Sequence, residues 1–217
     1  MIKSKAWDWK IVEGEDAEFW KTPNIESFYL IDRWLSQNKN YFLDLGCGLG
    51  RHTIQFAKAG FKTHAFDLSD KAIQSCEELA EKENLNIDFE TGDMLKLPYE
   101  NESMDCILCI NVIYHTDTEG MKQVVGEIFR VLKKNGECYL TLGSKETWGY
   151  KQDWPVVDDN TKVRIEDGPE NGIPHFYADS EVIFELFKDF QFITLTHMED
   201  NIVVHPGSWH YHMLIRK

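Results

Sequence analysis

The most constraining feature of this sequence is a glycine-rich stretch that directly follows a short apolar run. Residues 41–43 (Tyr-Phe-Leu) are followed by Asp44 and by three glycines at alternating positions, Gly46, Gly48 and Gly50. This order predicts a strand, a tight turn and the N-terminus of a helix, where a ligand can touch bare backbone. Dinucleotide-binding loops have the spacing G-x-G-x-x-G, whereas the spacing here is G-x-G-x-G. A carboxylate at position 44 repels a pyrophosphate and suits a ligand that carries an ammonium group.

The composition limits the class of protein. The chain has 217 residues, of which 42% are hydrophobic, so one α/β domain with a packed core is expected. No apolar run approaches the ~18 residues of a membrane span, and the first residues lack the apolar stretch of a signal peptide. The five cysteines are scattered, which argues against a disulfide framework. We therefore expect a cytoplasmic protein that does not associate with membranes.

The charge balance disfavours nucleic acid as a partner. Lys and Arg number 23 and Asp and Glu number 37, which gives a formal net charge of −14. Proteins that track a phosphate backbone usually carry a basic surplus on at least one face. The basic residues at 130–134 close a predicted helix, where cations complement the helix dipole.

Strand and helix patterns alternate along most of the chain. The expected strands cover residues 41–45, 62–66, 87–90, 105–112, 137–142, 191–196 and 209–215. Ser69 is expected to cap one of the intervening helices, Asn135-Gly136 to end another, and the last helix to cover residues 180–190. An early helix, capped by Asn24, is expected to bury a face made of Phe28, Ile31 and Leu35.

The strand ends carry polar groups at the edge of the sheet where ligands of doubly wound folds bind. Asp67 lies about twenty residues past the glycines, where a carboxylate can accept both hydroxyls of a ribose. Its alternative role is a helix cap, for which Ser69 is the better residue. Asp93 can accept from the exocyclic amine of an adenine, with the backbone amide and apolar flank of Met94 beside it. The alternative for Asp93 is a solvated loop acid.

With these residues the chain resembles the class I S-adenosylmethionine-dependent methyltransferases, from Phe42 to about Leu142. The matching motifs are the glycine loop with Asp44, then Asp67, Gly92-Asp93-Met94, Leu97-Pro98 and Arg130-Val131-Leu132-Lys133-x-x-Gly136. The resemblance implies an α/β, Rossmann-like sheet of seven strands, mostly parallel, in the order 3-2-1-4-5-7-6. Strand 7 is then antiparallel, and helices cover both faces. It also implies S-adenosylmethionine as the cofactor, held by Asp44, Gly46, Gly48, Gly50, Asp67, Leu68, Asp93, Met94 and Asn111.

We expect a single methyltransferase domain over residues 1–217, made of four consecutive parts. These are an N-terminal helical cap (1–40), a cofactor-binding core (41–142), a lid or substrate insertion (143–178) and a C-terminal helix with two strands (179–217). The insertion loses periodicity, and a long segment of this kind in a compact domain is usually a functional loop. Because two strands follow the last helix, one of them is expected to be antiparallel.

Residues beside the expected methyl group are candidates for contact with the methyl acceptor. Asn111 and Tyr114 have a spacing similar to the N-P-P-Y motif of amino-group methyltransferases, but both prolines are missing. His115 is a candidate base or substrate contact, and its alternative is a histidine bonded to local backbone. Tyr114 and His115 are therefore the catalytic candidates. Four further residues are expected to line the acceptor pocket, with lid packing as their alternative role: Trp20, Trp148, His175 and Tyr177.

Histidines and cysteines raise two other kinds of chemistry. His210 and His212 share one face of a strand and are candidate metal ligands together with His205 or His175. Scattered histidines on a sheet surface or lid are the commoner arrangement, so we expect no metal. The C-x-x-C of residues 106–109 lies in a predicted central strand, where its two cysteines point to opposite faces and are expected to be buried.

The leading hypothesis is methyl transfer from S-adenosylmethionine to a small-molecule acceptor, since the chain looks most like the small-molecule branch of the family. A second hypothesis is an enzyme that modifies a tRNA base or a protein side chain, and the negative charge counts against tRNA. A third is a non-catalytic S-adenosylmethionine-binding sensor or partner subunit. The sequence leaves the oligomeric state open, with a homodimer as one option.

Overall fold

The structure is a computed structural model of the chain, and it describes residues 4–9, 11–12, 18, 20–200 and 206–217. His205, one of the candidate metal ligands, lies outside the described residues. In the part of the chain that is described, no helix combines the length and the apolar character needed to cross a membrane.

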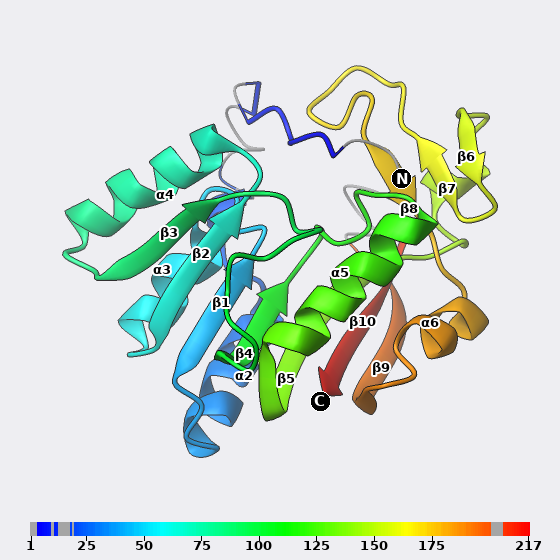
Figure 1. Cartoon of the computed structure of the whole chain (residues 1–217). Coiled ribbons are helices and arrows are strands. Elements are labelled where there is room, and N and C mark those ends of the chain that lie inside the picture. The colour runs from blue at the N-terminus through cyan, green and yellow to red at the C-terminus, as the bar shows by residue number, and fades with distance from the viewer. Residues whose placement is uncertain (1–3, 10, 13–17, 19, 201–205) are drawn as a thin grey trace.

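A seven-stranded sheet forms the centre of the molecule (Figure 1). Its strands are β1 (Tyr41–Leu45), β2 (Lys62–Asp67), β3 (Ile87–Thr91), β4 (Met104–Cys109), β5 (Leu132–Gly143), β9 (Gln191–Asp200) and β10 (Ser208–Arg216). Their order is β3-β2-β1-β4-β5-β10-β9. The pairs from β3 to β5 are parallel, whereas β10 runs antiparallel to β5 and to β9. The expected order, with the last strand of the chain antiparallel, is confirmed.

Helices cover both faces of the sheet, as expected (Figure 1). They are α2 (Ile25–Ser36), α3 (Arg51–Lys58), α4 (Asp70–Lys82), α5 (Thr118–Val131) and α6 (Ser180–Leu186). Alternation along β1 sends Leu43 into a core with α5 and α6, and Phe42 into a core with α2 and α3. Cys106 and Cys109 divide between the same two cores and are buried free thiols, which confirms the prediction for the C-x-x-C.

The predicted buried face of the first helix is wrong. In α2 the buried side chains are Ser27, Leu30 and Trp34, whereas Phe28 is 57% exposed and Leu35 is 40% exposed. The reason is a tertiary contact, because the Trp34 ring packs on the rings of two phenylalanines from β1 and α3. Its indole Nε1 also donates to a buried glutamate of β5. That contact rotates the helix away from the face that its apolar periodicity favours.

The boundary between α5 and β5 also differs from the prediction. The helix ends at Val131, and Leu132 already pairs with Met104 of β4. Asn135 adopts the left-handed conformation within β5, so the Asn-Gly pair bends a strand and does not cap a helix. The β4 pairing also ends earlier than expected, at Cys109.

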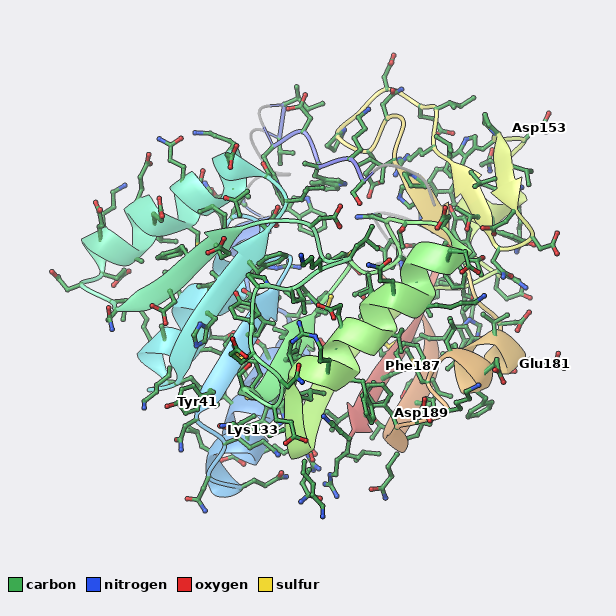
Figure 2. All side chains as sticks on the ribbon, in the orientation of Figure 1. Tyr41, Lys133, Asp153, Glu181, Phe187 and Asp189 are labelled. Atoms are coloured by element: carbon green, nitrogen blue, oxygen red, sulfur yellow. The ribbon has the colours of Figure 1, made fainter. Side chains whose placement is uncertain are left out.

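Near the start of β5, Lys133 makes two contacts at the amino end of the sheet. Lys133 lies 3.0 Å from the Asp105 carboxylate and 4.3 Å from the centroid of the Tyr41 ring. Figure 2 shows Tyr41 and Lys133 close together at the lower end of the sheet, away from the strand ends that carry the glycine loop. These contacts hold residues 132–136 on the sheet.

The segment without periodicity is folded. It contains a 3₁₀ helix, η1 (Trp148–Lys151), and a three-stranded antiparallel sheet made of β6 (Val156–Asp158), β7 (Thr161–Val163) and β8 (Pro174–Phe176). Strands of three residues are too short to produce an alternating pattern, which explains why sequence periodicity missed them. Figure 1 shows this small sheet and the N-terminal segment at the end of the molecule to which the parallel strands point.

Candidate functional site

A cavity of about 700 Å³ lies at the carboxyl ends of the parallel strands. The N-terminal segment, the strand ends and the lid segment (residues 143–178) contribute to its wall. It is lined by almost every residue predicted to form the site: Trp20, Asp44, Gly46, Gly48, Asp67, Leu68, Asp93, Met94, Asn111, Tyr114, His115, Trp148, His175 and Tyr177. Gly50 is the exception, and it begins helix α3. The structure therefore brings the residues predicted to hold the cofactor and those predicted to contact the acceptor together in one cavity.

The glycine loop needs glycine at each of its three positions. Gly46, Gly48 and Gly50 have φ angles of +79°, +52° and +86°, in the region that side chains disfavour. A Cβ atom on Gly46 would lie 2.2 Å from a methyl of Val112, and one on Gly50 would lie 2.4 Å from the sulfur of Cys76. The loop therefore presents backbone alone to the cavity at Gly46 and Gly48.

Asp44 is a buried acid in the cavity wall. The Thr53 hydroxyl donates to Oδ2 of Asp44 at 2.6 Å and fixes the carboxyl group. Burial raises the pKa of Asp44 to about 6, although the hydrogen bond from Thr53 and the charge of Arg51 oppose the shift. An ammonium group beside Asp44 would favour the ionised form.

Asp67 connects the end of β2 to the glycine loop. Its Oδ2 accepts from the Gly48 amide and its Oδ1 from the Ser69 amide, both at 2.9 Å. A carboxylate can accept about four hydrogen bonds, so Asp67 keeps acceptor capacity for a donor in the cavity. The hydroxyl of Ser69 accepts from the Ala72 amide and caps α4, so the predicted cap is confirmed. Burial raises the pKa of Asp67 above its usual value.

The turn that follows β4 contains a residue in the left-handed conformation. Asn111 has a φ of +60°, which is uncommon for a residue with a side chain and often marks a functional site. Thr141 stabilises it twice, because its hydroxyl oxygen accepts from the Asn111 amide and its O–H donates to Oδ1 of Asn111. The Phe176 amide donates to the carbonyl of Tyr114 at 2.7 Å, which ties the lid segment to this strand end.

The side chain of His115 faces the lid and not its local backbone. Its Nε2 lies 3.6 Å from Oε1 of Glu170, and Nε2 of His175 lies 3.5 Å from the same oxygen. Arg164 forms an ion pair with the other oxygen of Glu170. Burial lowers the pKa of His115 below its usual value. Tyr114 is buried beside this group, with its ring centroid 4.7 Å from that of His115.

The described late histidines lie in separate groups, His175 beside Glu170 and both His210 and His212 beside Asp200. His210 and His212 do share a face of β10, and both contact the Asp200 carboxylate, at 3.0 and 3.2 Å. His175 does not join them. Among the described residues, one group of His, Cys, Asp and Glu side chains has the spacing of a metal site, and it consists of His115, Glu170 and His175. His175 was considered as a ligand with His210 and His212 only as the alternative to the expected absence of a metal, and the structure places it beside His115 and Glu170 instead.

Several residues of the site were missed by the sequence analysis. Arg51 lines the cavity at the start of α3, with its guanidinium 5.0 Å from the centroid of the Trp20 ring. A cation in the first turn of a helix opposes the helix dipole, and this was a usable signal. Trp9 lies over the loop, where a Cβ atom on Gly48 would be 2.8 Å from its ring. Glu170 and Arg164 gave no signal, because their segment lacks periodicity.

Comparison with known proteins gives matches to methyltransferases and to a biotin biosynthesis protein. Residues 42–136 match a family model described as a methyltransferase domain. A biotin biosynthesis bifunctional protein of Teredinibacter turnerae is 35% identical over 134 residues, which are 56% of this chain and 23% of that protein. A sterol 24-C-methyltransferase of Schizosaccharomyces pombe is 28% identical over 178 residues, which are 78% of this chain and 44% of that protein. The chain thus spans less than half the length of either relative.

The fold has close matches among solved structures. The crystal structure of an S-adenosylmethionine-dependent methyltransferase from Methanosarcina mazei matches with a TM-score of 0.74 at 20% identity. The match covers 87% of this chain and 96% of that one. At 20% identity, this likeness shows only that the two proteins share a fold.

Proposed function

We propose that this chain is a class I S-adenosylmethionine-dependent methyltransferase and that it transfers a methyl group from this cofactor to a small-molecule acceptor, since residues 42–136 match a methyltransferase domain. The observation that carries the proposal is the single cavity of about 700 Å³, which runs from the glycine loop to the lid segment. Ligand sites commonly measure about 300–1,000 Å³. The cavity has the size for an adenosyl cofactor together with a small partner.

The residues at the strand ends fit the cofactor. Gly46 and Gly48 leave bare backbone where a Cβ would clash, which suits close approach of the methionine part. Asp44 supplies the negative charge for its ammonium group, and Arg51 of the same wall suits its carboxylate. Asp67 accepts from ribose hydroxyls through its remaining lone pairs. Asp93 and Met94 lie on the cavity wall and flank the adenine.

The remaining residues act on the acceptor and the surrounding water. S-adenosylmethionine supplies a methyl group on a sulfonium, which is already a good leaving group. The protein therefore mainly has to hold the acceptor in line, and a base is needed only when the acceptor arrives protonated. We assign Tyr114 and His115 to the face that the acceptor approaches. Trp20, Trp148, His175 and Tyr177 complete the pocket and exclude water.

The segments that cover part of the cavity favour a small acceptor over a macromolecule. Residues 4–9 and the lid segment both line it, so a tRNA base or a protein side chain would have to displace covering elements. The net charge of −14 also opposes a polyanion. We further propose that the protein works in the cytoplasm, since its five cysteines are all free and buried.

The proposal is tested by following S-adenosylhomocysteine formation from S-adenosylmethionine. Purified protein is incubated with a fractionated metabolite extract, with bulk tRNA and with a protein extract. We expect turnover with a metabolite fraction alone, and none for Asp67→Ala. Turnover with tRNA or protein alone would replace the proposed acceptor class. Cofactor binding without turnover in any fraction would favour the sensor hypothesis.

A further inference from the structure

We propose that His115, Glu170 and His175 form a binding site for one divalent transition-metal ion, and that Zn²⁺ is the ion that fits them best. These three side chains come from the loop between β4 and α5 and from the lid segment. They meet in the cavity wall, next to Tyr114. Metal binding here does not depend on the proposed methyl transfer.

The spacing of the three donor atoms matches a metal site. Oε1 of Glu170 lies 3.6 Å from Nε2 of His115 and 3.5 Å from Nε2 of His175. All three donor atoms lie within 4.8 Å of one another. In a tetrahedral zinc site with bonds of about 2.0–2.1 Å, neighbouring ligand atoms are about 3.3 Å apart. The two nitrogen–oxygen separations exceed that value by a few tenths of an ångström, which small rotations of the side chains remove.

The tautomer of His175 is set by its backbone. Its Nδ1 lies 3.0 Å from the carbonyl oxygen of Ile173. A carbonyl oxygen only accepts, so Nδ1 carries a proton, and Nε2 is the nitrogen that can present a lone pair to a metal ion. Metal-binding histidines are usually oriented in this way, through the N–H of their other nitrogen. A lone pair that faces a carboxylate oxygen is repelled unless a cation or a proton lies between them.

His115 provides a second, independent indication. Its Nε2 is fully buried and has no hydrogen-bond partner among the residues that the structure describes. Buried polar atoms are nearly always partnered, and an unpartnered one costs free energy. A metal ion bound between this nitrogen and Glu170 satisfies both atoms at once.

The carboxylate of Glu170 is also oriented by a contact of its other oxygen. Arg164 pairs with Oε2 of Glu170 and so directs Oε1 at the two imidazoles. The guanidinium of Arg164 lies 5.4 Å from the centroid of the Trp148 ring and 5.8 Å from that of Trp154. These rings fix the arginine, as supporting contacts fix the ligands of established metal sites.

The donor set selects the class of ion. Two imidazole nitrogens and one carboxylate oxygen suit Zn²⁺ and the neighbouring transition metals, whereas Mg²⁺ and Ca²⁺ prefer oxygen ligands throughout. Three protein ligands leave a coordination position open, as in catalytic zinc sites. An acceptor with a thiol or hydroxyl group is the ligand for that position, because a bound Zn²⁺ lowers the pKa of such a group. This last consequence rests on the proposed function, and the metal site itself does not.

The test measures metal binding directly, without cofactor or turnover. The full-length protein is treated with EDTA, dialysed and titrated calorimetrically with ZnCl₂. We expect one tight site per chain. We expect His115→Ala, Glu170→Gln and His175→Ala each to weaken its affinity at least about tenfold, as loss of even a supporting residue commonly does. The matched control is His64→Ala, which removes a histidine that contacts the carboxylate of Asp88 on β2 and β3. This variant should bind Zn²⁺ like the wild type.

The thermal shift with S-adenosylhomocysteine is measured on every variant, so that a folding defect or a damaged cofactor site is recognised. Absence of a tight site in the wild type would overturn the proposal, and would mean that a proton occupies the group. Equal affinity in the wild type and in the three variants would overturn it too.

A second measurement uses the unmutated protein and does not depend on whether a variant folds. In ¹⁵N spectra of the histidine rings, Zn²⁺ should shift the Nε2 signals of His115 and His175 alone. Shifts at His210 and His212 instead would move the metal to Asp200 and contradict the assignment. Failure of methyl transfer, in contrast, leaves both measurements unaffected.

Discussion

At the scale of single residues, the conformation of each glycine decides its tolerance to substitution. Gly46 has a φ of +79°, and a Cβ there would lie 2.2 Å from Val112. We expect Gly46→Ala to destabilise the protein by about 2–4 kcal/mol, because strain and overpacking add. Gly126 lies in α5 with nothing near its missing Cβ. We expect Gly126→Ala to stabilise by about 0.5–1 kcal/mol. Urea unfolding of both variants checks this pair, and an opposite order would contradict the geometry.

Asp44 makes cofactor affinity depend on pH. Burial raises the pKa of Asp44 to about 6 in the free protein. The ammonium of the ligand needs the ionised carboxylate, so affinity should be full above this pKa and fall as the pH drops through it. From about pH 7.5 to about pH 5 we expect S-adenosylhomocysteine to bind about tenfold more weakly.

Calorimetric titration of S-adenosylhomocysteine at several pH values measures the effect, and Asp44→Asn identifies its source. The variant should bind weakly at every pH, with a flatter profile. A wild-type profile that is flat or rises toward acid would refute the role of Asp44. The neighbouring Asp67 also has a raised pKa, and the Asn variant separates its contribution.

At the scale of elements, the sequence predicted strands well and helix faces less well. β1 and β2 could be predicted because each is an apolar run that ends at a glycine-rich or polar segment. The face of α2 was mispredicted because its orientation depends on Glu137, more than one hundred residues away along the chain. The strands of the lid segment were missed because three residues carry no readable period. A contact distant in sequence explains the first of these errors, and the shortness of the strands explains the second.

The glutamate that orients α2 should also stabilise the protein. The side chain of Glu137 is fully buried and pairs with Arg33 and Arg216, and the Trp34 indole donates to it. We expect Glu137→Gln to cost about 3 kcal/mol, at the low end for breaking a buried pair because both arginines are partly exposed. The exposed Glu119 is the control, where Glu119→Gln should change stability by less than about 1 kcal/mol.

Glu137 also makes the stability of the protein depend on pH, and its lowered pKa fixes the direction of this effect. The arginines and the indole hold the pKa of Glu137 below its usual 4.5, although burial opposes them. Its stabilisation is therefore complete above that value and is lost as the pH falls below it. Urea unfolding between neutral and acid pH should show a smaller loss of stability for Glu137→Gln than for the wild type. Parallel curves would show that the ion pairs contribute nothing.

At the scale of the whole molecule, the parallel sheet brings its strand ends together, and the N-terminal and lid segments cover part of the cavity. The cofactor half of the site was predictable, because Asp44, Asp67 and Asp93 each lie at or just after the carboxyl end of a recognisable strand. The half around Glu170 and Arg164 was not, because its geometry depends on how the lid segment folds against β4. The sequence was enough to find the acids that suit S-adenosylmethionine, whereas Glu170 and Arg164 could be found only from the structure.

The central claim is that this cavity binds S-adenosylmethionine through the strand-end acids. The most direct measurement is the calorimetric titration of S-adenosylhomocysteine and of NADH into the wild type and Asp67→Ala, with circular dichroism to show that the variant is folded. The account predicts saturable binding of S-adenosylhomocysteine to the wild type, none of NADH, and a loss of affinity in the variant. Binding of NADH, or unchanged affinity in a folded Asp67→Ala, would contradict it.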